Sequence, residues 1–380
     1  MTQQRSKLLD LLLDSPYAKI SSMPDVDIGQ AEVEPFPFLA IVGQKEMKLA
    51  LLLSLINPKI GGILLIGPRG TAKTTAVRSL IDLLPTIRRS LCVHGCSEER
   101  LDAEGMDGIC EDCREKVGYG EPLTVADKVR IIELPLNARL DDVVGGINER
   151  VALEQRRVIL ERGILANADN NILYIDEVNL LDDAITDAIL DASAQGHYTV
   201  RRGPMRLQYR SRIILIGSMN PEEGRLRPQI MDRFGLRALV TGLEDEEMRY
   251  RVYEHAMMYQ SNAAHFASLF ASNTLDLAQE VEDARARLPN VTIEEDAKKM
   301  GLMLIKSMKI DSNRAEITLF EAARAHAAAD EREVATVQDI KAVALLSLRQ
   351  RQSDELDSFM DKQSKEDEAL TLLIEKGADG

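Results

Sequence analysis

The segment that most constrains the fold is a short apolar run followed at once by a glycine-rich turn and a Lys-Thr pair. Residues 63–66 read ILLI, as expected of a buried parallel strand, and the octapeptide GPRGTAKT follows at 67–74. A helix is expected from Ala76 to Leu84. A strand, a glycine-rich turn and a helix in this order surround the phosphates of a nucleotide with backbone N–H groups. The sequence therefore predicts an α/β nucleotide-binding domain.

One position departs from the usual GxxxxGK[ST] spacing, because Ala72 stands where a second glycine is expected. Alanine tolerates helical backbone angles, so Ala72 is predicted to begin the helix. Lys73 is expected to reach the β- and γ-phosphates, and the Thr74 hydroxyl is expected to ligate Mg²⁺. The alternative interpretation is a chance turn that contains glycine and lysine.

Two further apolar runs end in polar residues that suit nucleotide hydrolysis. Residues 172–177 read ILYIDE, so Asp176 is expected to hold Mg²⁺ and Glu177 to activate the attacking water. The run IILI at 213–216 leads to Asn220, which can orient the same water. The alternative is a pair of exposed strand ends with surface carboxylates.

A short helix with an arginine at its end is predicted at 225–234, RLRPQIMDRF. Arg233 can project into the nucleotide site of a neighbouring subunit and neutralise charge in the transition state. Arg227 is the other candidate for this role. Alternatively, Arg233 pairs with Asp232 or caps its own helix.

All four cysteines of the chain fall within 22 residues, as Cys92, Cys96, Cys110 and Cys113. Two close pairs separated by a short polar loop, with no apolar pattern of its own, are typical of a structural zinc site. The alternatives are an iron–sulfur cluster, no metal, or two disulfides, which a reducing cytosol disfavours. His94 lies between the first two cysteines and can replace one of them.

Composition narrows the function classes. The formal net charge of −15 and the absence of Trp argue against broad nucleic-acid binding. No window of about 18 apolar residues predicts a membrane span, and no secretory signal is found, so a cytoplasmic location is expected. Leucines at positions 8–13 suggest an amphipathic helix, and the acidic residues of 352–380 predict a mobile tail.

Longer segments resemble AAA+ ATPases, and more closely the ATPase subunit I family of magnesium chelatase. The resemblance runs from Pro35 to Arg351 and includes IIELPLNARLDDVVGGIN (131–148), RGILANADNNILYIDEVNLLDD (162–183) and GSMNPEEGRLRPQIMDRFGL (217–236). It implies ATP and Mg²⁺ as cofactors, and a homo-oligomeric, hexameric ring. It also implies two partners, a large chelatase subunit that inserts magnesium into a porphyrin and an adaptor with an integrin-like I domain.

The resemblance also assigns roles to residues. The nucleotide is expected against Asp176 and the whole glycine-rich turn, namely Gly67, Pro68, Arg69, Gly70, Thr71, Ala72, Lys73 and Thr74. Asp176 and Glu177 form the Walker B pair, Asn220 is sensor 1, and Arg233 is the arginine finger. Arg314, at the start of a helix, resembles the sensor-2 arginine that reaches the γ-phosphate. Its alternative is an exposed arginine at a helix start.

The expected organisation is an N-terminal extension (1–34), an AAA+ domain (35–240) with a cysteine insert (85–128), a helical domain (241–351) and the tail. Two β-hairpins are expected, at 136–163 and at 197–212 with a Gly203-Pro204 turn. Leu288-Pro289 and Gly301 are read as local breaks in the helical domain. The nucleotide is expected between the two domains.

Three functions remain open from the sequence. The first is ATP-driven metal insertion by a chelatase. Pro68, Ala72 and the cysteine insert depart from the chelatase pattern. The second function is therefore that of a MoxR-type AAA+ chaperone, which activates a protein partner, because GPRGTAKT also resembles these proteins. The third is a helicase of the minichromosome-maintenance type, which the acidic composition disfavours.

Overall fold

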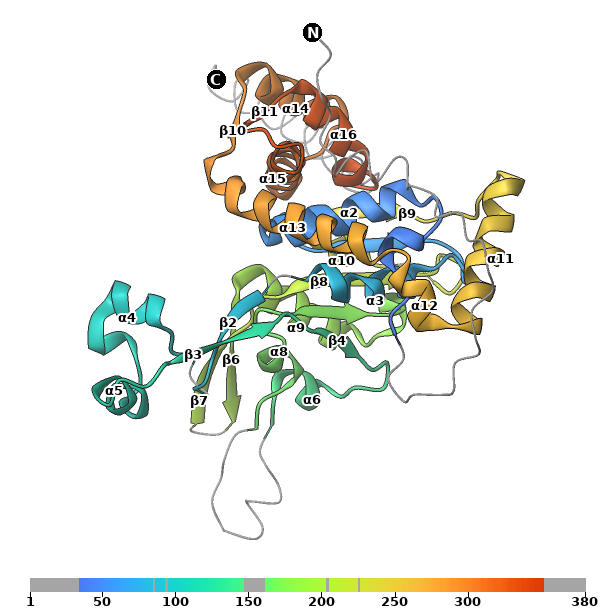
Figure 1. The fold of residues 1–380 in the computed structure, drawn as a ribbon. Coiled ribbons are helices and arrows are strands. Elements are labelled where there is room, and N and C mark those ends of the chain that lie inside the picture. The colour runs from blue at the N-terminus through green and yellow to red at the C-terminus, as the bar shows by residue number, and fades with distance from the viewer. Residues whose placement is uncertain are drawn as a thin grey trace, which may run out of the picture.

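A five-stranded sheet lies at the centre of the chain, with all neighbouring strands parallel (Figure 1). The computed structural model describes residues 34–84, 86–92, 95–146, 161–202, 205–224 and 226–351. In spatial order, the strands are β4 (Ile131–Leu134), β5 (Ile172–Ile175), β8 (Ile214–Met219), β1 (Ile63–Ile66) and β9 (Leu236–Leu239). The three apolar runs identified in the sequence are therefore three adjacent strands.

The strands are apolar throughout because both faces of the sheet are covered. Ile63 and Leu65 enter a core shared with α2 (Lys45–Ile56) and the C-terminal helices. Leu64 and Ile66 point the other way, into a core with α9 (Asp183–Gln195) and α10 (Pro228–Arg233). In the same alternation, Tyr174 of β5 lies on the α2 side of the sheet.

The helix after the glycine-rich turn is shorter than predicted. It starts at the lysine, as α3 (Lys73–Arg78), and continues as the 3₁₀ helix η3 (Ser79–Leu83). The remaining short elements of this domain are η1 (Phe38–Ala40), η2 (Pro58–Ile60), α6 (Leu140–Val144), α8 (Ile164–Asn167) and η5 (Val178–Leu180).

The cysteine insert projects from the domain on a two-stranded antiparallel ribbon (Figure 1). The ribbon joins β2 (Thr86–Ser90) to β3 (Thr124–Lys128), and its far end carries α4 (Glu98–Glu104), η4 (Gly105–Gly108) and α5 (Glu111–Gly118). The polar loop between the two cysteine pairs contributes one buried apolar side chain, Ile109. A small core forms because the helices bring together Cys96, Ile109, Cys113 and Leu123.

One of the two predicted hairpins is confirmed. Strands β6 (His197–Arg202) and β7 (Met205–Arg210) pair antiparallel, while the Gly203-Pro204 turn lies outside the described residues. Half of the hairpin predicted at 136–163, residues 147–160, falls outside the described part, and Leu140–Val144 form α6 rather than a strand.

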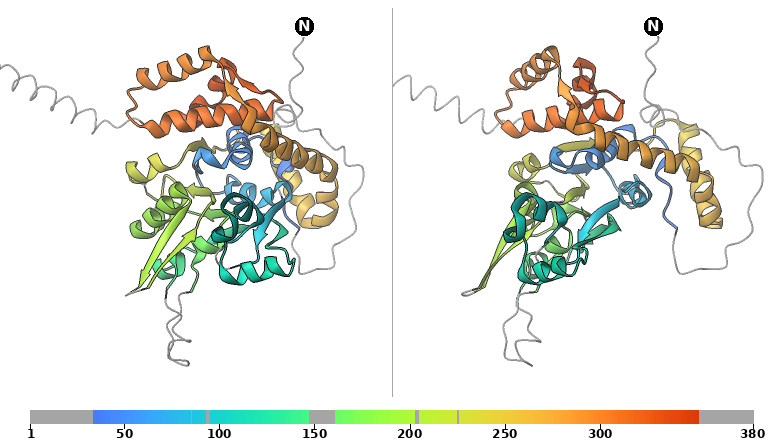
Figure 2. Two further views of the ribbon diagram at one scale, coloured as in Figure 1. Left: turned by 90° about the vertical axis from the view of Figure 1, so that its left-hand side faces the viewer. Right: turned by 60° about the vertical axis from the view of Figure 1, so that its left-hand side comes forward.

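Helices follow the sheet, as predicted, and lie on one side of it (Figure 2). They are α11 (Glu246–Ser261), α12 (Ala263–Ser268), α13 (Ala271–Arg287), η6 (Leu288–Asn290), α14 (Glu295–Ser307), α15 (Asn313–Ala329) and α16 (Val337–Leu348). A short parallel pair, β10 (Thr292–Ile293) with β11 (Val334–Ala335), was not predicted, because two-residue strands carry no periodic signal.

Gly301 is not the break that the sequence suggested. It lies buried within α14, where a Cβ atom would come 2.8 Å from the ring of Phe320 in α15. Glycine at this position therefore allows two helices to approach closely, and α14 runs through it.

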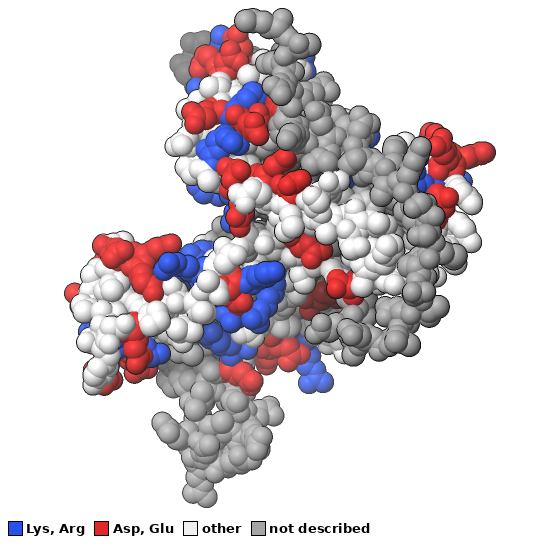
Figure 3. Space-filling model, viewed as in Figure 1, with Lys and Arg blue, Asp and Glu red and all other residues white. Residues whose placement is uncertain are grey.

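Acidic and basic side chains are interspersed over the face seen in Figure 3, with acidic ones along the upper edge of the insert at the left. Among the described residues, no helix combines the length and the apolar character that a bilayer crossing requires. The predicted amphipathic helix and acidic tail lie outside the described residues.

Candidate nucleotide site and cysteine cluster

The glycine-rich turn begins where β1 ends, at the carboxyl edge of the sheet. The Gly67 N–H donates to the Met219 carbonyl at 3.1 Å, which fixes the start of the turn beside β8. A Cβ on Gly67 would lie 1.9 Å from the Val240 carbonyl oxygen, so only glycine fits. The turn is thus packed tightly between two strands that follow it in sequence.

Ala72 does not adopt the helical conformation predicted for it. Its φ of 65° and ψ of 22° are left-handed, and the helix begins one residue later. The usual glycine of this pattern suits that conformation without cost, whereas alanine pays about 1–2 kcal/mol. Ala72 is therefore a strained position within the turn, as residues at functional sites often are.

Lys73 is held inside the turn by backbone oxygens. Its Nζ donates to the carbonyls of Gly67 and Pro68, each at 2.8 Å, and the side chain is buried. Burial lowers the pKa of the lysine, while the nearby carboxylates of Asp176 and Glu177 oppose this shift. The ammonium group therefore sits at the base of the predicted phosphate site, facing two acids.

Thr74, at the start of α3, and Asp176, directly after β5, lie within hydrogen-bond distance. The Thr74 hydroxyl donates to Asp176 Oδ2 at 3.1 Å, and Tyr174 OH donates to Asp176 Oδ1 at 2.9 Å. Tyr174 OH and Thr74 Oγ1 are also 3.1 Å apart. A hydroxyl and a carboxylate oxygen are donors that Mg²⁺ prefers, so these residues fit the predicted ion.

Hydrogen bonds favour the ionised form of Asp176. Burial by itself would raise the pKa of Asp176, but the hydroxyls of Ser218, Tyr174 and Thr74 donate to the carboxylate and lower the pKa below its usual range. The Lys73 ammonium acts in the same direction. An ionised carboxylate is the form that can ligate a divalent cation.

Glu177 occupies a strained backbone position at the end of β5. Its φ is 52°, in the left-handed region, and its N–H donates to Ser218 Oγ at 3.1 Å. Its carboxylate lies 3.4 Å from the guanidinium of Arg69, which also pairs with Glu223. The carboxylate of Glu177 is thereby held at the edge of the turn, one residue beyond Asp176.

Asn220 lies at the same edge, directly after β8. Its side chain is buried and accepts a hydrogen bond from the Glu222 N–H at 3.2 Å. Because β8 lies between β1 and β5, the residue after it falls between the glycine-rich turn and the Asp176-Glu177 pair. The structure thus brings together the sequence-predicted residues from three separate segments.

Three residues of the site were not predicted from the sequence. Tyr174 and Ser218 bond Asp176, and Glu223 pairs with Arg69. Tyr174 had a usable signal, because it stands two residues before Asp176 in an otherwise aliphatic strand. Ser218 and Glu223 had none, since their partners lie more than 40 residues away in sequence.

Tyr174→Phe is expected to raise the Mg²⁺-ATP concentration needed for half-maximal hydrolysis about two- to tenfold, as expected for one lost hydrogen bond to Asp176. The aromatic ring still fills the core, so the effect should appear in KM for the metal–nucleotide complex more than in kcat. Titrating Mg²⁺ at fixed ATP checks this. Tyr198→Phe in β6 is the matched control and should leave the titration unchanged. An unchanged curve for Tyr174→Phe would contradict the assigned contact.

The predicted finger arginine does not approach the glycine-rich turn of its own chain. Arg233 ends α10 and pairs with Asp191 of α9, and Arg227 pairs with Asp183 at 2.7 Å and more distantly with Asp187. Helix α10 leads into the amino end of β9, whereas the glycine-rich turn follows the carboxyl end of β1. Arg233 therefore lies at the edge of the sheet opposite the glycine-rich turn of its own chain.

Arg314 also lies away from the turn. It starts α15 and approaches Asp232 at 3.9 Å, and Ser312 donates to the same carboxylate. Asp232 precedes the amino end of β9, at the opposite edge of the sheet from Lys73. Helix α15, which carries Arg314, packs against α2 and η2.

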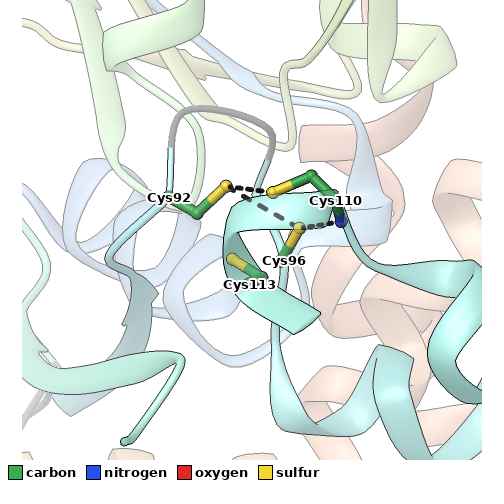
Figure 4. A group of neighbouring side chains, drawn as sticks. All are labelled: Cys92, Cys96, Cys110 and Cys113. Atoms are coloured by element: carbon green, nitrogen blue, oxygen red, sulfur yellow. Dashed lines mark hydrogen bonds between the residues drawn. The ribbon is translucent and has the colours of Figure 1, made fainter. Parts of the chain in front are cut away.

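The four cysteines meet at the far end of the β2–β3 ribbon (Figure 4). Their sulfur atoms all lie within 4.8 Å of one another. Cys96 and Cys113 are buried, and Cys92 and Cys110 are half-buried. The sequence prediction that the two pairs converge is thus confirmed, while His94 lies outside the described residues.

Two family models match the chain. One described as an AAA lid domain matches residues 304–370, and one described as an MCM P-loop domain matches residues 148–259. The crystal structure of a protein titled as an ATPase, from Cytophaga hutchinsonii, aligns with 84% of this chain and 86% of that chain. Its TM-score is 0.53 and its sequence identity is 20%. The last similarity shows a shared fold.

Two magnesium-chelatase relatives share a higher sequence identity with this chain than that crystal structure does. A magnesium-chelatase subunit ChlI homolog of Methanocaldococcus jannaschii is 43% identical over 316 residues, which are 83% of this chain and 85% of the relative. The magnesium-chelatase subunit ChlI of Nephroselmis olivacea is 39% identical over 341 residues, 89% of this chain and 95% of the relative. The similarity thus extends over nearly the whole of each relative.

Proposed function

Because the chain belongs to the magnesium chelatase subunit I family of AAA+ ATPases, we propose that it is the motor subunit of a chelatase. In this proposal it hydrolyses ATP to drive magnesium insertion into a porphyrin by a partner subunit. The observation that carries the proposal is the convergence of Lys73, Asp176, Glu177 and Asn220 at one edge of the sheet. The relatives named above supply the substrate class.

The residues of this edge divide the work of hydrolysis. The amides of the glycine-rich turn and the Lys73 ammonium bind the phosphates, and Thr74 and Asp176 would hold Mg²⁺. When bound, the ion neutralises charge on the β- and γ-phosphate oxygens. Glu177 accepts a proton from the attacking water, which Asn220 orients, while the bond between the γ-phosphorus and the ADP oxygen breaks.

The charge that develops in the transition state calls for positive groups beyond the Lys73 ammonium and the Arg69 guanidinium, which already lie at this edge. Arg233 and Arg314 lie at the opposite edge of the sheet, so a head-to-tail neighbour can present them to the phosphates. A head-to-tail contact repeated around an axis closes into a ring. The proposal therefore includes a homo-oligomeric ring, hexameric as in the resemblance, with Arg233 as the finger and Arg314 as sensor 2.

The ring is proposed to act on two further proteins. One is a large chelatase subunit that holds the porphyrin, and the other is an adaptor with an integrin-like I domain. The β6–β7 hairpin projects from the sheet domain and offers a contact surface for them (Figure 1). Nucleic acid is not expected as a partner, because the chain carries a net charge of −15.

Reconstitution tests the function. The chain is mixed with the candidate large subunit and adaptor from the same genome, a porphyrin, Mg²⁺ and ATP, and metal insertion is followed by porphyrin fluorescence. We expect insertion that requires ATP and is lost with Glu177→Gln in place of the wild-type chain. ATP hydrolysis without any insertion, in the presence of both partners, would contradict the chelatase proposal and leave the ATPase assignment intact.

A second candidate is a MoxR-like ATPase that remodels or activates a protein with an integrin-like I domain. The observation that favours it is the departure of Pro68 and Ala72 from the chelatase pattern within the turn itself. Affinity capture of the Glu177→Gln chain with ATP from its native cells separates the two. Recovery of a large chelatase subunit supports the first function, and recovery of an I-domain protein alone supports the second.

A further inference from the structure

We propose that the insert holds one structural zinc ion through the thiolates of Cys92, Cys96, Cys110 and Cys113. The site is independent of ATP hydrolysis, because it lies at the far end of the β2–β3 ribbon, away from the glycine-rich turn (Figure 1). Each pair of cysteines comes from one side of the insert, before α4 and at the start of α5. The chemistry of four thiolates around one point is that of a closed, non-catalytic zinc site.

The sulfur positions fit a tetrahedron around a single ion. Zn–S bonds of about 2.3 Å place the sulfurs of a tetrahedral site about 3.8 Å apart. Cys92 Sγ lies 3.7 Å from Cys96 Sγ and 3.5 Å from Cys110 Sγ. These separations are far longer than a disulfide bond of about 2.05 Å, so the geometry is that of four converging ligands.

The same distances argue against an iron–sulfur cluster. A cluster places several iron and sulfide atoms among its cysteine ligands, which must spread around it. Here all four sulfurs lie within 4.8 Å of one another, which leaves room for one ion. Tetrahedral tetrathiolate sites hold zinc or iron, and four protein ligands leave a tetrahedral ion no open position for chemistry.

Backbone contacts fix the ligands in place. The Cys110 N–H donates to Cys96 Sγ at 3.3 Å, and Ser90 Oγ accepts from the Cys92 N–H at 3.2 Å and donates to the Cys96 carbonyl at 2.6 Å. Gly95, at φ +69°, closes the turn between the first two cysteines. Such outer contacts orient metal ligands before the ion binds.

The insert needs an additional stabilising interaction, such as a bound metal ion, because its own core is small. Among the described residues between β2 and β3, the buried apolar side chains besides cysteine are Ile109 and Leu123. Structural units below about 40 residues usually require a metal, disulfides or oligomerisation to remain folded. A zinc ion bound by both halves of the insert meets that requirement, since metal binding adds directly to folding free energy.

The insert lies close to the β6–β7 hairpin beside the cysteine cluster. A Cβ atom built on Gly95 would lie 3.6 Å from the Arg210 side chain, so Gly95 is close to β7. Loss of the ion should therefore make the insert less ordered and weaken its contact with the hairpin, while the nucleotide site stays formed.

Metal analysis of the untagged, full-length chain tests the proposal. We expect one equivalent of zinc per chain and four thiols that react with a thiol reagent only after the metal is displaced. The chain has no other cysteine, so thiol counts report on this site alone. Substitution with Co²⁺ should give the visible absorption of a tetrahedral tetrathiolate. Displacing zinc should speed proteolysis within the insert and spare most ATP hydrolysis.

Variants make the test specific. Cys96→Ser and Cys113→Ser should each lose tight zinc binding, whereas Ser97→Ala, beside a ligand in sequence, should keep one equivalent. If the cysteine variants aggregate, the zinc content of the wild-type chain and its thiol count after metal displacement still test the site. Four reactive thiols without metal, two disulfides in the chain purified without reductant, or iron in place of zinc would each overturn the proposal.

Discussion

Glu177→Gln is expected to lower kcat for ATP hydrolysis about 10²- to 10⁴-fold, the usual loss when a general base is removed. ATP affinity should stay close to that of the wild type. Glutamine keeps the size of the side chain and the hydrogen bond from the Glu177 N–H to Ser218, but its amide accepts no proton from water. Lys73 and Thr74 remain in place to bind the phosphates. Phosphate release at saturating ATP and calorimetric titration measure the two quantities.

Lys73→Ala provides the contrast and should abolish ATP binding itself. The variant removes the buried ammonium from the turn and leaves Asp176 and Glu177 facing the phosphates without a compensating charge. The pair of variants separates binding from hydrolysis. Normal turnover by the Glu177→Gln chain would show that another group activates the water.

Arg233→Ala should lower kcat about 10³-fold or more, as expected for loss of an arginine finger, with little change in ATP affinity. A finger supplied by a neighbour acts mainly on the charge that develops in the transition state. Within its own chain, Arg233 contacts Asp191 rather than the glycine-rich turn. Steady-state hydrolysis at ring-forming concentration measures the loss, and sedimentation verifies that the rings remain intact.

Mixed rings test whether the arginine acts on a neighbouring site. Arg233→Ala and Glu177→Gln chains are each inactive, but a ring of both contains interfaces with an intact finger and an intact base. Partial recovery of hydrolysis on mixing is therefore expected. Arg227→Ala, which breaks pairs with Asp183 and Asp187, is the parallel variant. If Arg227→Ala lowers kcat strongly and Arg233→Ala does not, the arginine finger is Arg227 rather than Arg233.

The strands and the turn that carry the candidate nucleotide site were largely predictable because their signals are local. An apolar run that leads directly into glycines and a Lys-Thr pair predicts strand, turn and helix together, and the Asp176-Glu177 pair follows a run of the same kind. Parallel strands end at one edge, so residues that follow each run meet there. Backbone angles were less predictable, since the left-handed Ala72 depends on how the turn packs against neighbouring strands.

The sequence by itself determined the class of domain, the residues of the phosphate edge and the presence of a paired-cysteine insert. Each of these three features depends on the spacing of residues that are close together in the sequence, so it can be recognised without the structure. Only the tertiary structure decided that Tyr174 and Ser218 hold Asp176, that Arg314 lies at the opposite edge, and that four sulfurs meet within one ion's reach. These depend on contacts between segments distant in sequence, whose partners are selected by packing.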